Sequence, residues 1–467
     1  MSKVLLIKPR FLNFEFKAVT QPLGLMYIGA MLREYGHEPK IHDCALDHQD
    51  LHVLRRTIVN WEPDFIGLSI IVTELEQTKK IMEMIRELLP DVPVTFGGSW
   101  PTPNPEEALK EFGADYVVLG EGEFVFPDLI DAINKRLPTE EIPGTASIVN
   151  GELKINQGRF LTEAELNELP FPAWDLLDHK LYAKNLSGVA VGYRPYMSLF
   201  TSRGCPYRCA YCHQIMGKVF RRFSAESVLA EIEVLRAEYG FKEFEIFDDC
   251  FNVDRPRMRT ILQGISERFS DVKLHFPAIR ADILDPEDIS LFKKAGTVSA
   301  NFAIETTSPR LQKMIHKNLN IEKAARTIEA SIKAGIYSMG YFMLGFPTET
   351  YEEASATVDF AVRSSLHRAT FMLVTPYKGT ELAKMIPELR GKDDVDFRYM
   401  NFYNCKLNIS AMSDDELQTI FRKAYRRFYL NPKRLLRLVF HHPNTLSIPQ
   451  YAIITLIKAM PLPRKYE

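Results

Sequence analysis

The first 130 residues alternate short apolar runs with longer amphipathic stretches. The apolar runs predict buried strands at 4–7, 39–42, 65–70, 94–96 and 116–119. The stretches between them have helical periodicity, most clearly at 73–89. Strands that alternate with helices predict a parallel sheet with helices on both faces. We therefore expect a Rossmann-like, doubly wound α/β domain over residues 1–137, with its ligand at the carboxyl ends of the strands.

A second alternating region begins near residue 195. Its strands are predicted at 197–201, 244–247, 273–279, 299–305, 338–344 and 370–374. Helical patterns such as 225–238 and 322–334 separate them. Six strand-helix units would form an open barrel, and functional groups collect at the carboxyl ends of barrel strands. We predict a partial (β/α)6 barrel over residues 195–385.

Two regions lack this alternation. Residues 138–194 mix prolines, glycines and short segments, and we interpret them as a linker. Residues 386–467 are predicted to be helical, and two segments there, 421–430 and 433–440, mix basic and apolar positions at helical spacing. Such a pattern is typical of a helix on a membrane surface, and equally of a helix that caps the barrel with its arginines in solvent. We favour the cap over peripheral membrane contact.

Composition excludes several classes of protein. The net charge of −2 gives no bulk attraction to nucleic acid, so no nucleic-acid partner is expected. No apolar run approaches the length of a membrane span. The start of the chain has a strand pattern rather than that of a signal peptide. Six cysteines without such a leader fit a reducing compartment, which predicts a cytoplasmic location. Three of them, Cys44, Cys250 and Cys405, are scattered and are interpreted as ordinary buried thiols.

The other three cysteines follow the first barrel strand with the spacing C-x3-C-x2-C. Cys205, Cys209 and Cys212 would hold three irons of a four-iron cluster and leave the fourth open, whereas ordinary clusters take four thiolates. The alternative is a Cys3His zinc site completed by His213. Adjacent Cys212 and His213 strain simultaneous ligation, and zinc sites usually draw ligands from two separated pairs. The loop therefore predicts a [4Fe-4S] cluster with an open iron.

This loop and its flanks resemble the radical S-adenosylmethionine (SAM) superfamily. The resemblance implies that the amino and carboxylate groups of SAM chelate the open iron, and that an electron from the cluster yields a 5'-deoxyadenosyl radical. It also implies SAM contacts at the ends of the barrel strands, for which a solvated rim is the alternative at each charged residue. The implied contacts are Tyr211, Asp248, Asp249, Arg280, Glu305, Gly345 and Phe346.

The resemblance implies a role for five of these contacts. Asp248, in an Asp-Asp pair that stands where the family often has Gly-Gly-Glu, would accept a hydrogen bond from the SAM ammonium. Arg280 would pair with the SAM carboxylate, and the Glu305 carboxylate would approach SAM. The turn at Gly345 and Phe346 would shape the adenine pocket through its backbone groups.

Glycines and small polar residues follow the strands of the N-terminal domain. They allow backbone to approach a large ligand, although a tight turn explains any one of them alone. Together they resemble the cobalamin-binding domain that precedes many radical SAM barrels. The implied cobalamin contacts are Gly24, Leu25, Ser69, Ile70, Gly97, Gly98, Ser99, Gly120, Glu121 and Gly122.

The loop at 9–20 departs from the wider cobalamin-binding pattern. Methionine synthase and the mutases have Asp-x-His-x-x-Gly there, with the histidine on cobalt, but this loop has no histidine. His52 lies in a partial match that follows the second strand and lacks the glycine, and we interpret it as an ordinary helix residue. The resemblance to cobalamin-dependent radical SAM enzymes implies that cobalamin binds with its dimethylbenzimidazole tail displaced and no histidine on cobalt.

The combined resemblance covers residues 1–385 and identifies a cobalamin-binding radical SAM enzyme, related to the anaerobic Mg-protoporphyrin monomethyl ester cyclase group. It implies methylation of an unactivated carbon of a small molecule through methylcobalamin and the deoxyadenosyl radical, with ferredoxin or flavodoxin as electron donor under anaerobic conditions. One alternative is a radical enzyme that cyclises, rearranges or oxidises its substrate without methyl transfer. Another is a cobalamin-binding sensor with a structural cluster.

Overall fold

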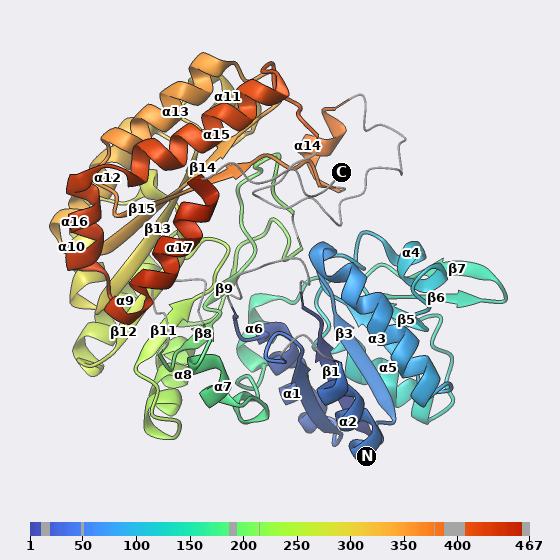
Figure 1. The fold of residues 1–467 in the computed structure, drawn as a ribbon. Coiled ribbons are helices and arrows are strands. Elements are labelled where there is room, and N and C mark those ends of the chain that lie inside the picture. The colour runs from blue at the N-terminus through green and yellow to red at the C-terminus, as the bar shows by residue number, and fades with distance from the viewer. Residues whose placement is uncertain are drawn as a thin grey trace. The chain divides into compact units, whose positions relative to one another are not determined.

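The computed structural model describes residues 1–10, 19–47, 51–185, 194–213, 215–377, 379–386 and 407–459, and it divides into two compact units (Figure 1). The first unit comprises residues 1–182 and 215–217, and the second comprises 183–214 and 218–467.

The first unit contains a seven-stranded sheet with helices on both faces. Its strands are β1 (Lys3–Lys8), β2 (Glu38–Asp43), β3 (Phe65–Ser69), β4 (Val94–Gly97), β5 (Tyr116–Val118), β6 (Thr145–Val149) and β7 (Glu152–Ile155). Its α-helices are α1 (Leu23–Glu34), α2 (His52–Trp61), α3 (Leu75–Leu88), α4 (Pro105–Lys110), α5 (Val125–Asn134) and α6 (Glu163–Glu168). The order is β2-β1-β3-β4-β5-β6-β7, and β1 to β5 are parallel. The predicted doubly wound domain is confirmed, and its five predicted strands match β1 to β5 to within one residue at each end.

Alternation along β1 explains why helices cover both faces. Val4 and Leu6 pack in a core with residues of α1 and α5. Leu5 and Ile7 point to the opposite face and pack with residues of α2, α3 and α4. Successive side chains of a strand point to opposite faces, so a continuous apolar run produces two cores rather than one.

The predicted linker is corrected by the structure. Within 138–194, β6 pairs antiparallel with β5 and β7 pairs antiparallel with β6, so this stretch extends the first sheet. Asn150 and Gly151 join β6 to β7 with φ angles of 51° and 82°. An Asn-Gly pair with positive φ at both residues is typical of a two-residue β-hairpin turn. The two strands that it joins lie in the stretch that the sequence analysis interpreted as a linker.

The second unit contains an open six-stranded parallel sheet. Its strands are β8 (Met197–Leu199), β11 (Glu243–Ile246), β12 (Lys273–Ile279), β13 (Thr297–Glu305), β14 (Tyr337–Leu344) and β15 (Arg368–Leu373). The order β15-β14-β13-β12-β11-β8 confirms the predicted partial barrel. Its helices are α8 (Ala225–Ala237), α9 (Arg255–Arg268), α10 (Pro286–Lys294), α11 (Pro309–Met314), α12 (Ile321–Lys333), α13 (Tyr351–Arg363) and α14 (Glu381–Lys384), and α7 (His179–Ala183) spans the boundary between units. A short antiparallel pair that was not predicted, β9 (Ser202–Arg203) with β10 (Arg221–Arg222), closes the base of the cysteine loop.

The chain continues beyond the barrel as the helices α15 (Asp414–Tyr429), α16 (Pro432–His441) and α17 (Ile448–Ala459), which confirms a helical C-terminal region (Figure 1). Two tyrosines of α15 bond to the free edge of β15. Tyr425 donates to the Phe371 carbonyl at 2.9 Å and accepts from the Phe371 amide at 3.2 Å. Tyr429 makes the same pair of bonds with Ala369, at 2.8 and 3.2 Å. No helix within the described ranges is long and apolar enough to cross a bilayer.

Candidate active site

The cysteine loop is fixed over the carboxyl ends of the barrel strands. The Ala210 amide donates to the Ile315 carbonyl at 2.9 Å, and the Ala210 carbonyl accepts from the Leu382 amide at 2.7 Å. Ala210 also packs in one apolar cluster with Phe346 and Val374, which follow β14 and β15. The loop therefore lies at the end of the barrel where functional groups were expected.

The three predicted cluster ligands form a set suited to iron. A hydrogen bond from the Cys212 thiol lowers the pKa of Cys209 to about 6, with further help from the Lys317 charge and against the effect of burial. A hydrogen bond from the Cys250 thiol lowers the pKa of Cys205. The thiolate is the form that binds metals, so Cys205 and Cys209 are favoured for ligation, whereas the hydrogen bond to Cys209 and burial raise the pKa of Cys212. The donor set of three neighbouring cysteines fits a cluster.

Cys250 is a site residue that the sequence interpretation missed. It follows β11 directly after the Asp-Asp pair, is buried, and its thiol contacts the predicted cluster ligand Cys205. Its sulfur is also 3.6 Å from Oδ1 of Asn252. The signal that was available is its place at the carboxyl end of a barrel strand. Of the other two thiols, Cys44 is buried in the first unit and Cys405 lies outside the described residues.

Glu305, Lys317 and Tyr211 converge beside this loop. Lys317 Nζ donates to Glu305 Oε1 at 2.9 Å and to the Tyr211 hydroxyl at 3.2 Å, and the same hydroxyl is 3.2 Å from Glu305 Oε1. Glu305 has a φ of 67°, a left-handed conformation that strains a non-glycine residue and is concentrated at functional sites. Its buried Oε2 has no hydrogen-bond partner among the described residues. An orphaned carboxylate oxygen at the end of a barrel strand fits contact with a cationic or hydroxyl group of SAM.

Lys317 was not predicted, because it lies in the loop after α11 rather than at a strand end.

Tyr211 and Phe346 have ring centroids 6.1 Å apart, so two implied SAM contacts from distant parts of the chain are neighbours. Burial raises the pKa of Tyr211, and the Glu305 charge adds to this effect.

The two aspartates after β11 hold the base of the cysteine loop. Asp248 accepts from the Thr201 amide and hydroxyl, both at 2.6 Å, and from the Ser202 hydroxyl at 2.5 Å. Asp249 accepts from the Gly204 amide at 3.2 Å. Burial raises the pKa of both carboxyls. Their contacts are therefore with the protein's own loop, and contact between Asp248 and the SAM ammonium stays a prediction.

Arg280 also has partners within the protein. Its Nε and Nη2 donate to the Asp282 carboxylate at 2.9 and 3.2 Å, and Nη2 donates to the Lys317 carbonyl at 3.0 Å. The guanidinium lies 3.9 Å from the ring centroid of Tyr207 in the cysteine loop, a cation–π contact. These contacts brace the loop and the Lys317 turn, and pairing with the SAM carboxylate stays a prediction.

The turn after β14 is held by a buried carboxylate. The amides of Gly345 and Phe346 donate to Glu349 Oε2 at 2.5 and 3.0 Å. Burial raises the pKa of Glu349 to about 7. Gly345 has a φ of 95°, which favours glycine. The predicted adenine contact at this turn would therefore use backbone groups other than these two amides.

Polar side chains also line the inner face of the barrel sheet. Ser198 donates to Glu245 at 3.0 Å, and Asn301 donates to the Tyr341 hydroxyl at 3.1 Å. Burial raises the pKa of Glu245 to about 7. Tyr341 points away from the helices, because its neighbour Phe342 packs on α13. The sequence interpretation missed these residues because a single polar residue within an apolar strand gives no sign that its side chain lies near a functional site.

The loops at the carboxyl ends of the first sheet contain the implied cobalamin contacts. A Cβ on Gly98, which has a φ of 100°, would stand 2.8 Å from the Ile70 carbonyl oxygen, so the protein's own backbone requires this glycine. A Cβ on Gly24 or Gly120 would meet nothing within 4 Å. Glu121 is buried and accepts from the Leu161 amide at 2.7 Å. The remaining candidates lie in α1 or near the ends of β3, β4 and β5, and stay predictions: Leu25, Ser69, Ile70, Gly97, Ser99 and Gly122.

Thr102 connects two of these loops and was not predicted. Its hydroxyl donates to the Gly98 carbonyl at 2.8 Å and accepts from the Gly120 amide at 3.1 Å.

In the loop at 9–20, which was predicted to lack a histidine ligand for cobalt, residues 11–18 lie outside the described residues. His52 begins α2, in keeping with its interpretation as a helix residue.

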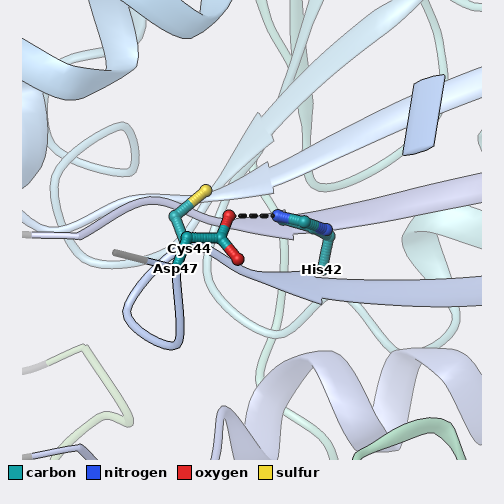
Figure 2. Close-up of side chains that lie close together, drawn as sticks. All are labelled: His42, Cys44 and Asp47. Atoms are coloured by element: carbon teal, nitrogen blue, oxygen red, sulfur yellow. Dashed lines mark hydrogen bonds and ion pairs between the residues drawn. The ribbon is translucent and has the colours of Figure 1, made fainter. Parts of the chain in front are cut away.

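His42, Cys44 and Asp47 bring three potential metal-ligand atoms within 4.8 Å of one another at the end of β2 and in the turn that follows it (Figure 2). His42 Nε2 is 2.8 Å from Asp47 Oδ2. Burial and the nearby Asp47 charge raise the pKa of Cys44 well above its ordinary value. The imidazole–carboxylate hydrogen bond and the buried thiol account for this cluster as part of the turn, and we assign no metal to it.

Comparison with known proteins agrees with this geometry. Residues 9–130 match the B12 binding domain, and residues 199–361 match the Radical SAM superfamily. An uncharacterized methyltransferase of Pyrococcus horikoshii is 30% identical over 424 residues, which cover 90% of each chain. The cytidylyl-2-hydroxyethylphosphonate methyltransferase of Streptomyces wedmorensis is 28% identical over 91% of this chain and 90% of its own. The structure of the radical SAM methyltransferase TsrM from Kitasatospora setae, with cobalamin and a [4Fe-4S] cluster bound, shares the fold with a TM-score of 0.70 at 22% identity, over 83% of this chain and 78% of TsrM.

Proposed function

Because this chain belongs to the cobalamin-binding radical SAM enzymes, we propose that it transfers a methyl group to an unactivated carbon atom of a small-molecule substrate. It is an enzyme whose cofactors are a [4Fe-4S] cluster, SAM and cobalamin. The observation that carries the proposal is similarity to two proteins named as methyltransferases, over at least 90% of this chain and 90% of each of theirs. When bound, the cluster supplies the electron that splits SAM, and cobalamin carries the methyl group.

The residues of the barrel have separable tasks in this proposal. Cys205, Cys209 and Cys212 hold three irons and leave the fourth to SAM. Glu305 presents its unpartnered Oε2, and Lys317 fixes the carboxylate by bonding to the other oxygen. Phe346, packed beside Tyr211, helps to exclude water from this end of the barrel.

We further propose that no histidine ligates cobalt. The loop at 9–20 contains no histidine, and His42 Nε2 is already hydrogen-bonded to Asp47. Electron paramagnetic resonance of the protein loaded with Co(II) cobalamin tests this proposal, since a histidine ligand would add nitrogen hyperfine splitting. Such splitting that disappears in His42→Ala or His52→Ala would overturn it.

The electron donor in this proposal is ferredoxin or flavodoxin, in a reducing cytoplasm. An open, oxygen-sensitive cluster needs a reductant of low potential, and none of the proposed cofactors is a net source of electrons over repeated turnovers. Replacing a chemical reductant by reduced flavodoxin should sustain repeated turnovers. Failure of both flavodoxin and ferredoxin to do so would argue against this choice of partner.

The deciding experiment follows the products of SAM. Anaerobically reconstituted protein is incubated with SAM and a strong reductant, with and without cobalamin, and 5'-deoxyadenosine and S-adenosylhomocysteine are measured by mass spectrometry. Both products, with S-adenosylhomocysteine only when cobalamin is present, support a methylase. Deoxyadenosine alone favours a radical enzyme without methyl transfer, and neither product from protein with full iron and cobalt content favours the sensor. Cys209→Ala is the control that should form neither product.

A further inference from the structure

The end of the chain is strongly basic, although the whole protein has a net charge of −2. From residue 417 to residue 466 there is no aspartate or glutamate. The described part of this stretch contains Arg422, Lys423, Arg426, Arg427, Lys433, Arg434, Arg437 and Lys458. Such a charge asymmetry within one chain indicates affinity for an anionic partner.

Helix α16 is oriented with its central arginine inward. Arg434 is only 4% exposed, and its guanidinium donates to the carbonyl groups of Leu366, Val362 and Ser364, the last two at 2.7 and 3.0 Å. It also lies 3.7 Å from the ring centroid of Phe428 on α15. These contacts attach α16 to the barrel through a polar group.

The opposite side of α16 is apolar and exposed. Leu435, Leu436, Val439 and Phe440 have exposed fractions of 46%, 59%, 50% and 77%. Their spacing places them on one side of a helix, where they form what we call the α16 stripe. Leu446, which is 82% exposed, follows shortly after the helix. A surface helix in contact with water alone would place these side chains inward and its arginine outward.

Basic side chains border the α16 stripe. Lys433, Arg437 and His441 are exposed and recur every fourth residue, so they form a ridge beside Leu436 and Phe440. On the neighbouring α15, Lys423 and Arg426 are exposed as well. Exposed leucine and phenylalanine with a lysine- and arginine-rich border are the features of helices that lie in a membrane interface.

The sequence pattern alone favours a barrel cap, and α15 makes such contacts with β15, but the apolar residues of α16 are exposed. We therefore propose that the α16 stripe and its basic border form a peripheral docking surface for a membrane leaflet that contains anionic phospholipids. The apolar side chains enter the boundary between headgroups and acyl chains, and the basic border contacts the lipid phosphates. Contact is with one leaflet, because none of the helices in the described part of the chain can span a bilayer. This inference does not depend on methyl transfer, since it needs no cofactor.

The test is flotation of the full chain with lipid vesicles. Binding is expected to vesicles of phosphatidylcholine with phosphatidylglycerol and to be much weaker with phosphatidylcholine alone. Adding salt should weaken it, because the electrostatic part is screened. Lys433→Glu with Arg437→Glu should lower affinity at least about twentyfold, since each basic side chain near an anionic surface contributes about fivefold. Leu436→Glu with Phe440→Glu should lower it by at least about tenfold.

A matched control replaces two apolar residues that are exposed elsewhere. Val59→Glu with Leu137→Glu changes side chains that are 53% and 55% exposed in the first unit, and it should leave vesicle binding unchanged. All variants should keep the wild-type circular dichroism spectrum, since only exposed side chains are changed.

Two results would overturn the proposal. The first is equal vesicle binding by wild type and Leu436→Glu with Phe440→Glu. The second is the absence of binding to phosphatidylglycerol vesicles; if light scattering then shows a dimer that this double variant dissociates, the α16 stripe is an interface between two copies of the chain.

Discussion

Lys317 and Glu305 form a buried ion pair beside the cysteine loop, with 2.9 Å between Nζ and Oε1. Both side chains are 7% exposed, and the lysine also bonds to the Tyr211 hydroxyl. The charges of both residues also act on Cys209, where Lys317 lowers the pKa of the thiol and Glu305 raises it. The pair therefore fixes both the strained residue at the end of β13 and the tyrosine of the cysteine loop.

Lys317→Met should destabilise the second unit by about 3 kcal/mol, because removing one partner leaves an uncompensated buried charge. The measurement is thermal unfolding of the cluster-free protein. Lys317→Met combined with Glu305→Gln should recover part of the loss, since the charge is then removed. Strictly additive losses would show that the two residues do not interact.

In reconstituted protein, Glu305→Gln should weaken SAM binding, whereas Glu287→Gln, at an exposed residue of α10, should not.

Cys250→Ala should lower the reduction potential of the cluster. Hydrogen bonds to cluster sulfurs are among the factors that set the potential, and the Cys250 thiol donates to Cys205. A bond of about 1 kcal/mol corresponds to about 40 mV for one electron. A redox titration followed by electron paramagnetic resonance measures the shift, with Cys250→Ser expected to shift less and Cys44→Ala not at all. A changed cluster type in Cys250→Ala would instead reveal a fourth ligand.

Cys209→Ala should abolish cluster assembly and SAM cleavage together. Iron and sulfide content, together with 5'-deoxyadenosine formation, should fall to background, since one of three ligands is lost. Cys44→Ala is the matched control, because it removes a buried thiol of the first unit. Retained deoxyadenosine formation in Cys209→Ala would refute the assignment of the cluster to this loop.

Glu231→Gln should stabilise the protein increasingly as pH rises from 6 to 8. Glu231 lies in α8, is buried, and its Oε1 has no hydrogen-bond partner in the described residues. Burial raises its pKa from 4.5 to about 8. The pKa of Glu231 is higher in the folded than in the unfolded protein. Its contribution to the free energy of unfolding is therefore most favourable below pH 4.5 and falls as pH rises towards 8. The advantage of the variant in thermal unfolding should therefore grow by about 2 kcal/mol between pH 6 and 8. A constant advantage across this range would show that the carboxyl does not titrate there.

Tyr425→Phe with Tyr429→Phe should expose the edge of β15. The rings remain, but the amides and carbonyls of Ala369 and Phe371 lose their partners. An expected loss of about 2–4 kcal/mol follows from unsatisfied buried backbone groups. Hydrogen exchange should accelerate at these two amides. Tyr35→Phe removes a surface hydroxyl contact and should change neither quantity.

The sequence predicted those parts of the molecule in which the pattern is local. The strands could be predicted from continuous apolar runs, and the cluster ligands from three cysteines within one loop. Neither prediction depended on contacts between distant residues. The β6–β7 hairpin was missed because its Asn-Gly signal lies among prolines and glycines that were read as a linker.

Contacts between distant residues could not be predicted in the same way. Lys317 meets Tyr211 across 106 positions of sequence, and Cys250 meets Cys205 only because neighbouring parallel strands end at the same edge. Asp248 and Arg280 follow β11 and β12, as the strand pattern predicted, and their contacts with SAM stay predictions. Their bonds to Thr201 and Asp282, however, depend on loop geometry that residue spacing does not encode.

The two tyrosines on the edge of β15 also bear on how the chain is made. They lie 54 and 60 positions after the strand residues that they contact. At translation rates of about 5–20 residues per second, the barrel's last strand leaves the ribosome roughly three to twelve seconds before its partners. During that interval the nascent sheet ends in unpaired backbone groups, which are a template for pairing with other chains. Synthesis of α15 is therefore the step that ends the period in which this edge of the newborn barrel is open to pairing with other chains.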